Sequence, residues 1–305
     1  MKGRIILAGG SGFIGRHLCE LFADRGDEIV ILSRGPDEKK GSVRYAHWDG
    51  RTVGDWLGFV DGARAVINLA GKSINCRPTP KNRQEIVESR VNSVQALGQA
   101  IKRCSRPPEC FVQASAIGIY RSSRDCCCDE TAPYGNQFEA TVCKAWESAV
   151  EQIDAPGMRN IIFRQGVVLG RDGGLLKVLG RLTKWFLGGH VGDGGQFVSW
   201  IHIDDLAQMF SWATERNDIT GVFNATSPNP VTNKQLMREL RSALHRPYSP
   251  PVPVLAVRIG SWIMGANAEL ALTSHRCTPS RFLEKRFQFR FPDVRGALAD
   301  IYRRS

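Results

Sequence analysis

The stretch Leu7-Ala8-Gly9-Gly10-Ser11-Gly12-Phe13-Ile14-Gly15 decides the fold of this chain. It places glycines at positions 9, 12 and 15 between an apolar run at 5–8 and an amphipathic segment at 13–23. At such a strand-to-helix turn the first glycine makes the tight turn, the second lets the backbone approach a pyrophosphate, and the third allows close helix–strand packing. Free N–H groups and the dipole at the start of the helix hold the anion. The stretch therefore predicts a dinucleotide-binding turn.

The rest of the chain alternates short apolar runs with helical patterns. Apolar runs predict strands at 5–8, 29–32, 43–46, 65–69, 110–115, 160–163 and 221–225. Periodic patterns predict helices at 13–23, 81–102, 142–153, 175–187, 205–214 and 254–264. This alternation is typical of an α/β fold with a Rossmann-type doubly wound parallel sheet.

Beyond Gly170 the alternation loosens. Residues 197–203 read as an extended segment, 247–253 as a proline-rich connector, and 288–292 as a short aromatic strand before a final helix. We therefore place a boundary near residue 170. Residues 1–170 would form the nucleotide-binding domain, and residues 171–305 a smaller substrate-binding lobe with elements that return to the sheet.

Composition predicts a packed, soluble protein. The chain has 305 residues, of which 42% are hydrophobic and 23% charged, and a formal net charge of +11. Lysines and arginines are spread along the chain, so we expect no nucleic acid as a partner; a basic groove for an anionic ligand, or plain solubility, explains the charge as well. No apolar run is long enough for a bilayer or a signal peptide, so we expect no membrane partner and a cytoplasmic protein.

Nine cysteines are present, and their spacings match no zinc pattern, so we expect no metal. Their only cluster is Cys126-Cys127-Cys128. Adjacent cysteines point in different directions, which makes a poor metal site. Reduced thiols are the favoured interpretation of this cluster, and a redox-sensitive loop is the alternative.

The end of the second predicted strand, Ser33-Arg34, bears on which dinucleotide binds. NAD sites usually carry an acidic residue here, and a carboxylate would repel a 2′-phosphate. Ser33 can donate a hydrogen bond, and Arg34 can pair with the phosphate through charge-assisted bonds. We therefore expect NADP(H) as the cofactor, the alternative being that Arg34 is only a solvated surface residue.

Two further segments are expected near the cofactor. Small residues in Asn68-Leu-Ala-Gly71 let the backbone pass beside the adenosine ribose. On the following helix, Glu85 and Arg90 lie five residues apart. Arg90 either contacts the cofactor or only flanks the apolar stripe of that helix.

Together these pieces resemble the extended short-chain dehydrogenase/reductase superfamily. The glycine turn, Asn68–Gly71, Ser115-x-x-x-x-Tyr120, Arg164–Gly170 and Trp200-Ile-His-Ile-Asp-Asp205 come in the superfamily's order. Asn68–Ile74, Ser89-Arg-Val91, Trp146-Glu147, Val168–Gly174, 189–202 and Gln288-Phe-Arg-Phe-Pro292 resemble its atypical branch, the epimerase family, described as nucleoside-diphosphate-sugar epimerase-like or as cell-division-inhibitor homologues.

The resemblance implies a small-molecule substrate, a carbonyl compound or a nucleotide sugar, and places the nicotinamide beside the strand end at 165–167. With the motifs above, the expected cofactor-binding residues are Gly9, Ser11, Gly12, Phe13, Ile14, Ser33, Arg34, Leu69, Ala70, Glu85, Arg90, Ser115 and Val167.

The superfamily's chemistry needs a serine or threonine, a tyrosine acid/base and a lysine four residues after the tyrosine. None of the five tyrosines here has a lysine four residues on. The resemblance puts Glu139 at the tyrosine position, Cys143 at the lysine position and Ala116 at the serine position. All three usual catalytic residues are therefore replaced.

Four residues are candidate substitutes: Tyr120, Glu139, Cys143 and His202. Glu139 would need burial to raise its pKa, and Cys143 would need a lowered pKa. For His202 a structural bond to Asp204 or Asp205 is the favoured interpretation. We expect each candidate to be non-catalytic.

Two hypotheses for function follow. The first is an NADP(H)-dependent oxidoreductase or epimerase-like enzyme with non-standard catalytic residues. The second is an NADP(H)-binding regulatory or sensor protein without turnover. A third, nucleic-acid binding, is disfavoured and would predict strongly salt-dependent affinity for DNA.

Overall fold

A central eight-stranded sheet organises the computed structural model, which describes residues 3–303. The strand order is β12-β8-β6-β5-β1-β2-β4-β3, and every neighbouring pair is parallel except β3–β4. The strands are β1 (Arg4–Ala8), β2 (Glu28–Ser33), β3 (Glu38–Lys40), β4 (Val43–His47), β5 (Ala65–Asn68), β6 (Cys110–Ala116), β8 (Arg159–Gln165) and β12 (Gly221–Ala225). The expected Rossmann-type α/β fold is confirmed.

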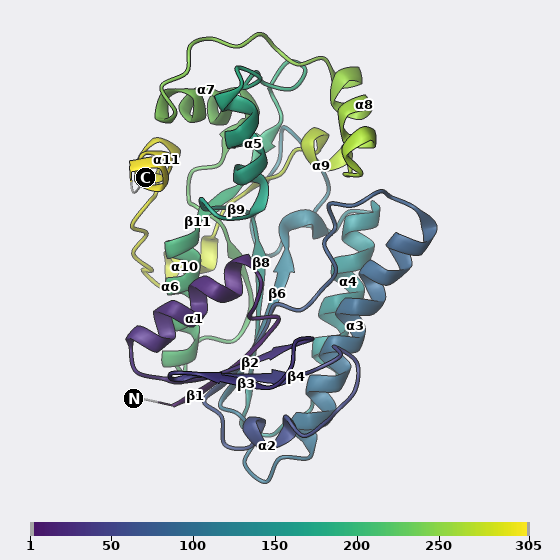
Figure 1. Cartoon of the computed structure of the whole chain (residues 1–305), viewed down its shortest axis with the longest axis vertical. Helices are drawn as coiled ribbons and strands as arrows, with labels where there is room; N and C mark the ends of the chain where they lie inside the picture. The colour runs from purple at the N-terminus through teal and green to yellow at the C-terminus, as the bar shows by residue number, and fades with distance from the viewer. Residues whose placement is uncertain (1–2, 304–305) are drawn as a thin grey trace.

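Helices cover both faces of this sheet (Figure 1). One face carries α1 (Phe13–Asp24) and α6 (Ile203–Glu215); the other carries α2 (Leu57–Val60), α3 (Pro80–Lys102) and α4 (Phe138–Glu151). Ile5 and Leu7 point into the first cluster, while Ile6 and Ala8 point into the second. Both faces of β1 are thus buried, because successive side chains of a strand alternate between faces.

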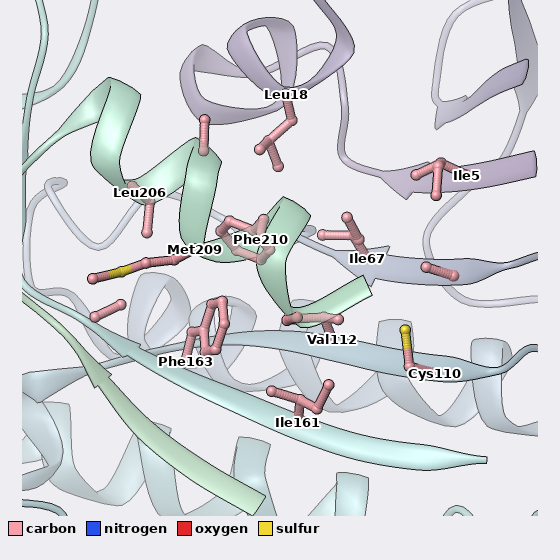
Figure 2. Close-up of a cluster of buried hydrophobic side chains, with 14 of the residues drawn as sticks. Ile5, Leu18, Ile67, Cys110, Val112, Ile161, Phe163, Leu206, Met209 and Phe210 are labelled. Atoms are coloured by element: carbon pink, nitrogen blue, oxygen red, sulfur yellow. The ribbon is translucent and has the colours of Figure 1, made fainter. Parts of the chain in front are cut away.

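The layer under α6 is rich in aromatic side chains, and Figure 2 shows Phe210 and Phe163 meeting there. Their ring centroids lie 5.0 Å apart in an edge-to-face arrangement, which is a favourable geometry for an aromatic pair. Leu18 of α1 reaches the same cluster from above (Figure 2). This packing fixes the strands whose ends carry the candidate site.

A second group of elements lies above the carboxyl ends of the strands (Figure 1). It comprises α5 (Gly174–Lys184), α7 (Asn233–Ala243), α8 (Val254–Met264), α9 (Glu269–Leu272) and α11 (Val294–Arg303). Three short pairs accompany them: β9 (Val167–Leu169) with β11 (Trp200–His202), β10 (Phe197–Val198) with β13 (Val231–Thr232), and β7 (Cys127–Cys128) with β14 (Arg276–Cys277). Helix α10 (Ser280–Glu284) instead lies against β12, and its Phe282 belongs to the core cluster under α6.

This upper group has its own apolar cluster, which includes Leu176, Leu240 and Leu298. Strand β12 nevertheless pairs with β8 in the main sheet, so the chain crosses back after α6. The boundary placed near residue 170 stays a prediction. Among residues 3–303, no helix combines the length and the apolar character needed to cross a membrane.

Several expected elements differ in the structure. Residues 288–292 do not form a strand: the backbone N–H groups of Arg290 and Phe291 donate to the Asp205 carboxylate, each at 2.9 Å, and so are not available to a sheet. Helix α5 ends at Lys184, and Phe186 beyond it has a φ of 63°, which does not continue a right-handed helix. Helix α4 begins at Phe138, four residues before the predicted start, so Glu139 lies in its first turn.

Candidate functional site

The glycine turn joins β1 to α1, and its glycines differ in what surrounds them. Gly9 has a φ of +77°, and a Cβ there would lie 3.0 Å from the Ala70 backbone. A Cβ on Gly15 would lie 2.4 Å from Gly10 Cα. Gly12 has a φ of −75°, and a Cβ there would meet only the Gly9 carbonyl oxygen, at 3.4 Å. The fold thus requires glycine at 9 and 15 but leaves open space above Gly12.

The first turn of α1 faces this open space. Gly12 is its N-cap and brings no side chain to the free N–H groups of Phe13 and Ile14. Ser11 is exposed beside it. The ring of Phe13 lies under the turn at 170–174, where a Cβ on Gly173 would come within 2.3 Å of Phe13 Cγ. The start of α1 therefore touches the segment that leads into the upper group of elements.

Strand β2 ends beside the glycine turn, since the Gly9 N–H donates to the Leu32 carbonyl at 3.0 Å. Ser33 is partly buried and Arg34 is exposed. Within residues 3–303 the Arg34 guanidinium has no hydrogen-bond or ion-pair partner, unlike most arginines of this chain. An unengaged guanidinium at this edge can pair with an anion brought by a ligand.

The end of β5 is held by a buried amide. The Asn68 side chain donates to Ser93 (3.1 Å) and to Gln113 (2.9 Å), and its oxygen accepts the Ala70 N–H at 3.0 Å. These bonds hold Leu69 and Ala70 against Gly9. The glycine turn after β1, Ser33 and Arg34 at the end of β2, and Leu69 and Ala70 after β5 therefore lie at one edge of the sheet.

Glu85 and Arg90 face the loop after β5. The Glu85 carboxylate pairs with the Lys72 ammonium group, which lowers the pKa of Glu85. Arg90 donates to the Lys72 carbonyl at 2.9 Å, and its guanidinium lies 4.8 Å from the centre of the Trp146 ring. Burial lowers the pKa of Arg90. Both side chains organise this loop, and a direct cofactor contact stays a prediction for each.

A buried ion pair lies at the ends of β6 and β8. Arg164 Nη2 is 2.8 Å from Glu147 Oε2, and the Ser115 hydroxyl donates to the same carboxylate at 2.6 Å. Arg164 also donates to the hydroxyls of Tyr120 and Tyr134, each at 2.8 Å. Sequence reasoning missed this network, although a signal was present: Glu147 lies on the apolar face of α4, between Cys143 and Val150. A carboxylate on such a face needs an internal partner.

Tyr120 and Cys143 are both occupied within this region. The Tyr120 hydroxyl donates to Asn224 Oδ1 at 2.8 Å, and burial raises the pKa of Tyr120. The Cys143 thiol contacts the Ala116 carbonyl oxygen at 3.6 Å, and burial raises the pKa of Cys143 to about 11. The lowered pKa that proton transfer by Cys143 would need is therefore not found.

Glu139 is the candidate substitute with a free functional group. It is partly buried beside Gly118, where a Cβ would lie 3.2 Å from Glu139 Cβ. Among the described residues its carboxylate has no hydrogen-bond or ion-pair partner. A carboxylate in this state can bind and exchange a proton with a ligand.

His202 caps helix α6. Its Nδ1 accepts the Asp204 N–H at 3.1 Å, and its ring lies 3.9 Å from the Phe291 ring. With Asp204 and Asp300 it forms a group whose potential ligand atoms lie within 4.8 Å of one another. His17 bonds Asp204 at 2.8 Å and His202 lies 3.6 Å from Asp300, so capping and ion pairing explain the group.

The last two predicted positions lie where the sheet meets the upper elements. Val167 opens β9, and its N–H donates to the Ser199 carbonyl at 2.8 Å. Ser115 is buried and already donates to Glu147. Neither placement tests a contact with a cofactor, and both remain predictions.

Comparison with known families and structures gives consistent matches. The NAD dependent epimerase/dehydratase family matches residues 5–225, and a domain of unknown function matches residues 252–301. The epimerase family protein YfhF of Bacillus subtilis is 34% identical over 302 residues, with 97% of each chain covered. The epimerase family protein SDR39U1 of Mus musculus is 33% identical, with 98% of this chain and 99% of that protein covered.

Two solved structures are similar over nearly all of this chain. Human epimerase family protein SDR39U1 (isoform 2), determined with NADPH, has a TM-score of 0.89 at 31% identity and covers 99% of this chain and 100% of its own. The nucleoside-diphosphate sugar epimerase from Corynebacterium glutamicum has a TM-score of 0.79 at 30% identity, covering 99% of this chain and 58% of its own.

Proposed function

This chain belongs to the NAD dependent epimerase/dehydratase family, and on that premise we propose that it binds NADP(H) and acts as an oxidoreductase or epimerase-like enzyme without the usual Ser-Tyr-Lys residues. The observation that carries the cofactor assignment is Gly12. Neither the φ of Gly12 nor the atoms around it require a glycine at this position. The presence of glycine there, which leaves open space at the start of α1, is best explained by the close approach of a ligand.

Arg34 supports the phosphorylated form of the dinucleotide. Its guanidinium is exposed and unengaged among residues 3–303, at the same edge of the sheet as Gly12. The similar human protein was determined with NADPH. Gly12, Phe13 and Ile14 would hold the diphosphate through backbone N–H groups, and Ser33 with Arg34 would bind the 2′-phosphate.

Bound NADPH would supply a hydride, and the chain would have to supply a proton and position the substrate. Ser115 and Cys143 are unsuited to the proton step because one is bonded to Glu147 and the other is held protonated by burial. Glu139 is the favoured proton donor, because its carboxylate is partly buried and has no partner within the described residues.

The substrate would lie below the upper elements, at the carboxyl ends of the strands. A hollow of about 380 Å³ opens between residues 77–79 and α8–α9, and Arg77, Arg258 and Trp262 line it. Glu269 lines the hollow as well and pairs with Arg258 at 3.7 Å, which leaves Arg77, lying over the Trp262 ring, to bind an anionic substrate with a flat or apolar part. A carbonyl compound or a nucleotide sugar satisfies this description.

A binding titration tests the cofactor assignment. We expect Arg34→Ala to weaken NADPH binding by about 1.5–3 kcal/mol, a loss of roughly 10- to 150-fold, because a charge-assisted hydrogen bond is lost. NADH binding should change little. Arg103→Ala is the matched control, because Arg103 is exposed at the far end of α3. Equal weakening of NADPH and NADH by Arg34→Ala would contradict the role of Arg34.

A turnover assay separates the enzyme from the alternative, an NADP(H)-binding sensor or regulator. The occupied Cys143 thiol favours that alternative, since Cys143 stands at the position of the usual lysine and Ala116 at that of the usual serine. Purified protein is incubated with NADPH and a panel of carbonyl compounds and nucleotide sugars. Steady NADPH oxidation that falls about 100-fold or more in Glu139→Gln supports the enzyme. Tight NADPH binding with neither NADPH oxidation nor interconversion of any nucleotide sugar supports the sensor.

A further inference from the structure

The run Cys126-Cys127-Cys128 divides between solvent and interior. Cys126 and Cys127 are exposed, whereas Cys128 is 7% exposed. Cys128 belongs to β7, which pairs in parallel with β14 so that Cys128 lies opposite Cys277. Cys277 is fully buried. Two cysteines far apart in the sequence are thus cross-strand neighbours on one side of a two-stranded ribbon.

The spacing of this ribbon suits a covalent bond. Neighbouring strands lie about 4.8 Å apart. A disulfide requires a Cα–Cα separation of roughly 4.4–6.8 Å, with both Cβ vectors on the same side. Residues opposite each other in register meet both conditions, and the two side chains share one buried cluster with Ile119 and Tyr120. A bond can therefore form without separating the strands.

The Cys128 thiol also differs from the other buried cysteines in the direction of its pKa shift, whereas the Cys277 thiol is held protonated. A hydrogen bond from the Cys277 thiol lowers the pKa of Cys128 to about 7. Burial raises the pKa of Cys110 and of Cys143 to about 11. A lowered pKa favours the thiolate form of Cys128, which is the nucleophilic form.

We propose that Cys128 and Cys277 are a redox-active pair that forms a reversible intramolecular disulfide under attack by a hydroperoxide. The Cys128 thiolate attacks the terminal peroxide oxygen and breaks the O–O bond, giving a sulfenic acid and an alcohol, or water when the oxidant is hydrogen peroxide. Cys277 sulfur then attacks the Cys128 sulfur, the S–O bond breaks, and the hydroxyl leaves with the thiol proton as water. In total two thiols lose two electrons, and the peroxide gains them.

The bond would join two parts of the molecule next to the candidate site. The Cys128 carbonyl accepts the Thr278 N–H at 2.9 Å and the Asn224 side-chain amide at 3.4 Å. Asn224 in turn accepts the Tyr120 hydroxyl. Oxidation would therefore tie the segment after β6 to the segment before α10 and restrain the surroundings of Tyr120, whatever reaction the protein performs.

Peptide mapping of the full chain tests this proposal. Reduced protein is treated with graded hydrogen peroxide, free thiols are alkylated under denaturing conditions, and digests are analysed by mass spectrometry. We expect a cross-linked peptide that joins Cys128 to Cys277 and disappears with dithiothreitol. We also expect the oxidised protein to melt roughly 5–10 °C above the reduced form, because the bond closes a long loop.

Cysteine variants identify which thiols form the disulfide. Cys126→Ser/Cys127→Ser should keep the cross-link. Cys277→Ser, whose hydroxyl can still donate to Cys128 but cannot form a disulfide, should leave a Cys128 sulfenic acid that dimedone traps. Cys104→Ala is the matched control, since Cys104 is partly buried in a different cluster and its thiol donates to the Ala100 carbonyl. If Cys277→Ser does not fold, Cys128→Ala serves instead and should leave Cys277 reduced. Cross-links through Cys126 or Cys127, disulfides only between molecules, or a Cys277 that stays reduced in the wild type would overturn the proposal.

Discussion

Gly12 and Gly15 stand three residues apart in one motif, yet different causes require them. Gly15 is fixed by the protein itself, since a Cβ there would overlap the Gly10 backbone. Gly12 has an ordinary φ and free space, so a side chain would fit the apoprotein. Substitution separates the two causes, because one residue serves folding and the other serves binding.

Gly12→Ser is expected to leave stability unchanged or slightly higher while weakening NADPH binding. Serine is a favoured N-cap, and the extended backbone of Gly12 suits it, so the gain is a few tenths of a kcal/mol. The same hydroxymethyl group fills the space for the diphosphate and should raise the dissociation constant about tenfold or more. Thermal melting and NADPH titration measure both effects.

Gly15→Ala is the comparison for this variant. Its added methyl group would meet backbone atoms at 2.4–2.6 Å, so the melting temperature of the protein without NADPH should already fall. If Gly12→Ser binds NADPH as the wild type does, the assignment of this turn to the diphosphate is wrong.

At the scale of elements, α4 carries a charge on the face that packs against the sheet. Glu147 is 6% exposed and shares its carboxylate between Arg164 and Ser115. The pair fixes the angle at which α4 meets β6 and β8, because bonds from three elements converge on one group. It also holds Tyr134 of the connecting loop through Arg164.

Glu147→Ala is therefore expected to reduce the free energy of unfolding by about 3–5 kcal/mol, since it leaves the buried Arg164 cation unpaired. Urea unfolding at neutral pH measures the loss. Glu151→Ala removes an exposed carboxylate from the last turn of the same helix and should change stability by less than about 0.5 kcal/mol. Similar small losses for both variants would contradict a stabilising role for the buried pair.

The elements that sequence predicts well are those with local signals. The strand Gly221–Ala225 and the helix Val254–Met264 have the predicted bounds, because each is a mostly apolar segment with a clear limit, a glycine at the start of the strand and Pro253 and Gly265 on either side of the helix. β3 was missed because Glu38–Lys40 is wholly exposed and only its pairing with β4 makes it a strand. The aromatic run at 288–292 has the pattern of a strand, but the N–H groups of Arg290 and Phe291 are bonded to Asp205 instead of a neighbouring strand.

In the candidate site, too, the features with local sequence patterns are predictable, and those that depend on contacts between distant segments are not. The glycine turn and the Ser33-Arg34 strand end are local patterns, so sequence indicates both. The Arg164–Glu147 pair and the Lys72–Glu85 pair depend on which segments meet in space, and neither spacing follows a helical or strand period. Sequence reasoning therefore gives no sign of the Lys72–Glu85 pair and leaves Glu147 without a role, while a cofactor contact of Glu85 stays a prediction.

At the scale of the whole molecule, the upper elements are tied to the sheet by polar segments as well as by the apolar clusters. The Ser123 N–H donates to the Ser274 carbonyl at 2.9 Å, and the His275 N–H donates to the Phe197 carbonyl at 3.1 Å. The Ser199 hydroxyl donates to the His275 carbonyl at 2.9 Å. Residues 274–277 thus join the loop after β6 to the segment before α6.

His275 makes this junction sensitive to acid. Burial lowers the pKa of His275 to about 4, and among the described residues its Nδ1 has no hydrogen-bond partner. The pKa is about 6.5 in the unfolded chain, so between about pH 6.5 and pH 4 the unfolded state binds more protons. The neutral His275 side chain therefore makes its full contribution to the free energy of unfolding above about pH 6.5. This contribution is lost as the pH falls toward 4.

Urea unfolding at about pH 7.5 and about pH 5 should show this loss as roughly 2 kcal/mol in the wild type beyond the loss in His275→Gln, which has no imidazole to protonate. Other groups that titrate in this range act in both proteins and cancel in the difference. His245→Asn is the matched control, because His245 is exposed and asparagine tolerates its φ of 52°. It should follow the wild type at both values of pH. A wild type and a His275→Gln variant with the same pH dependence would show that the buried imidazole does not control the acid stability of this junction.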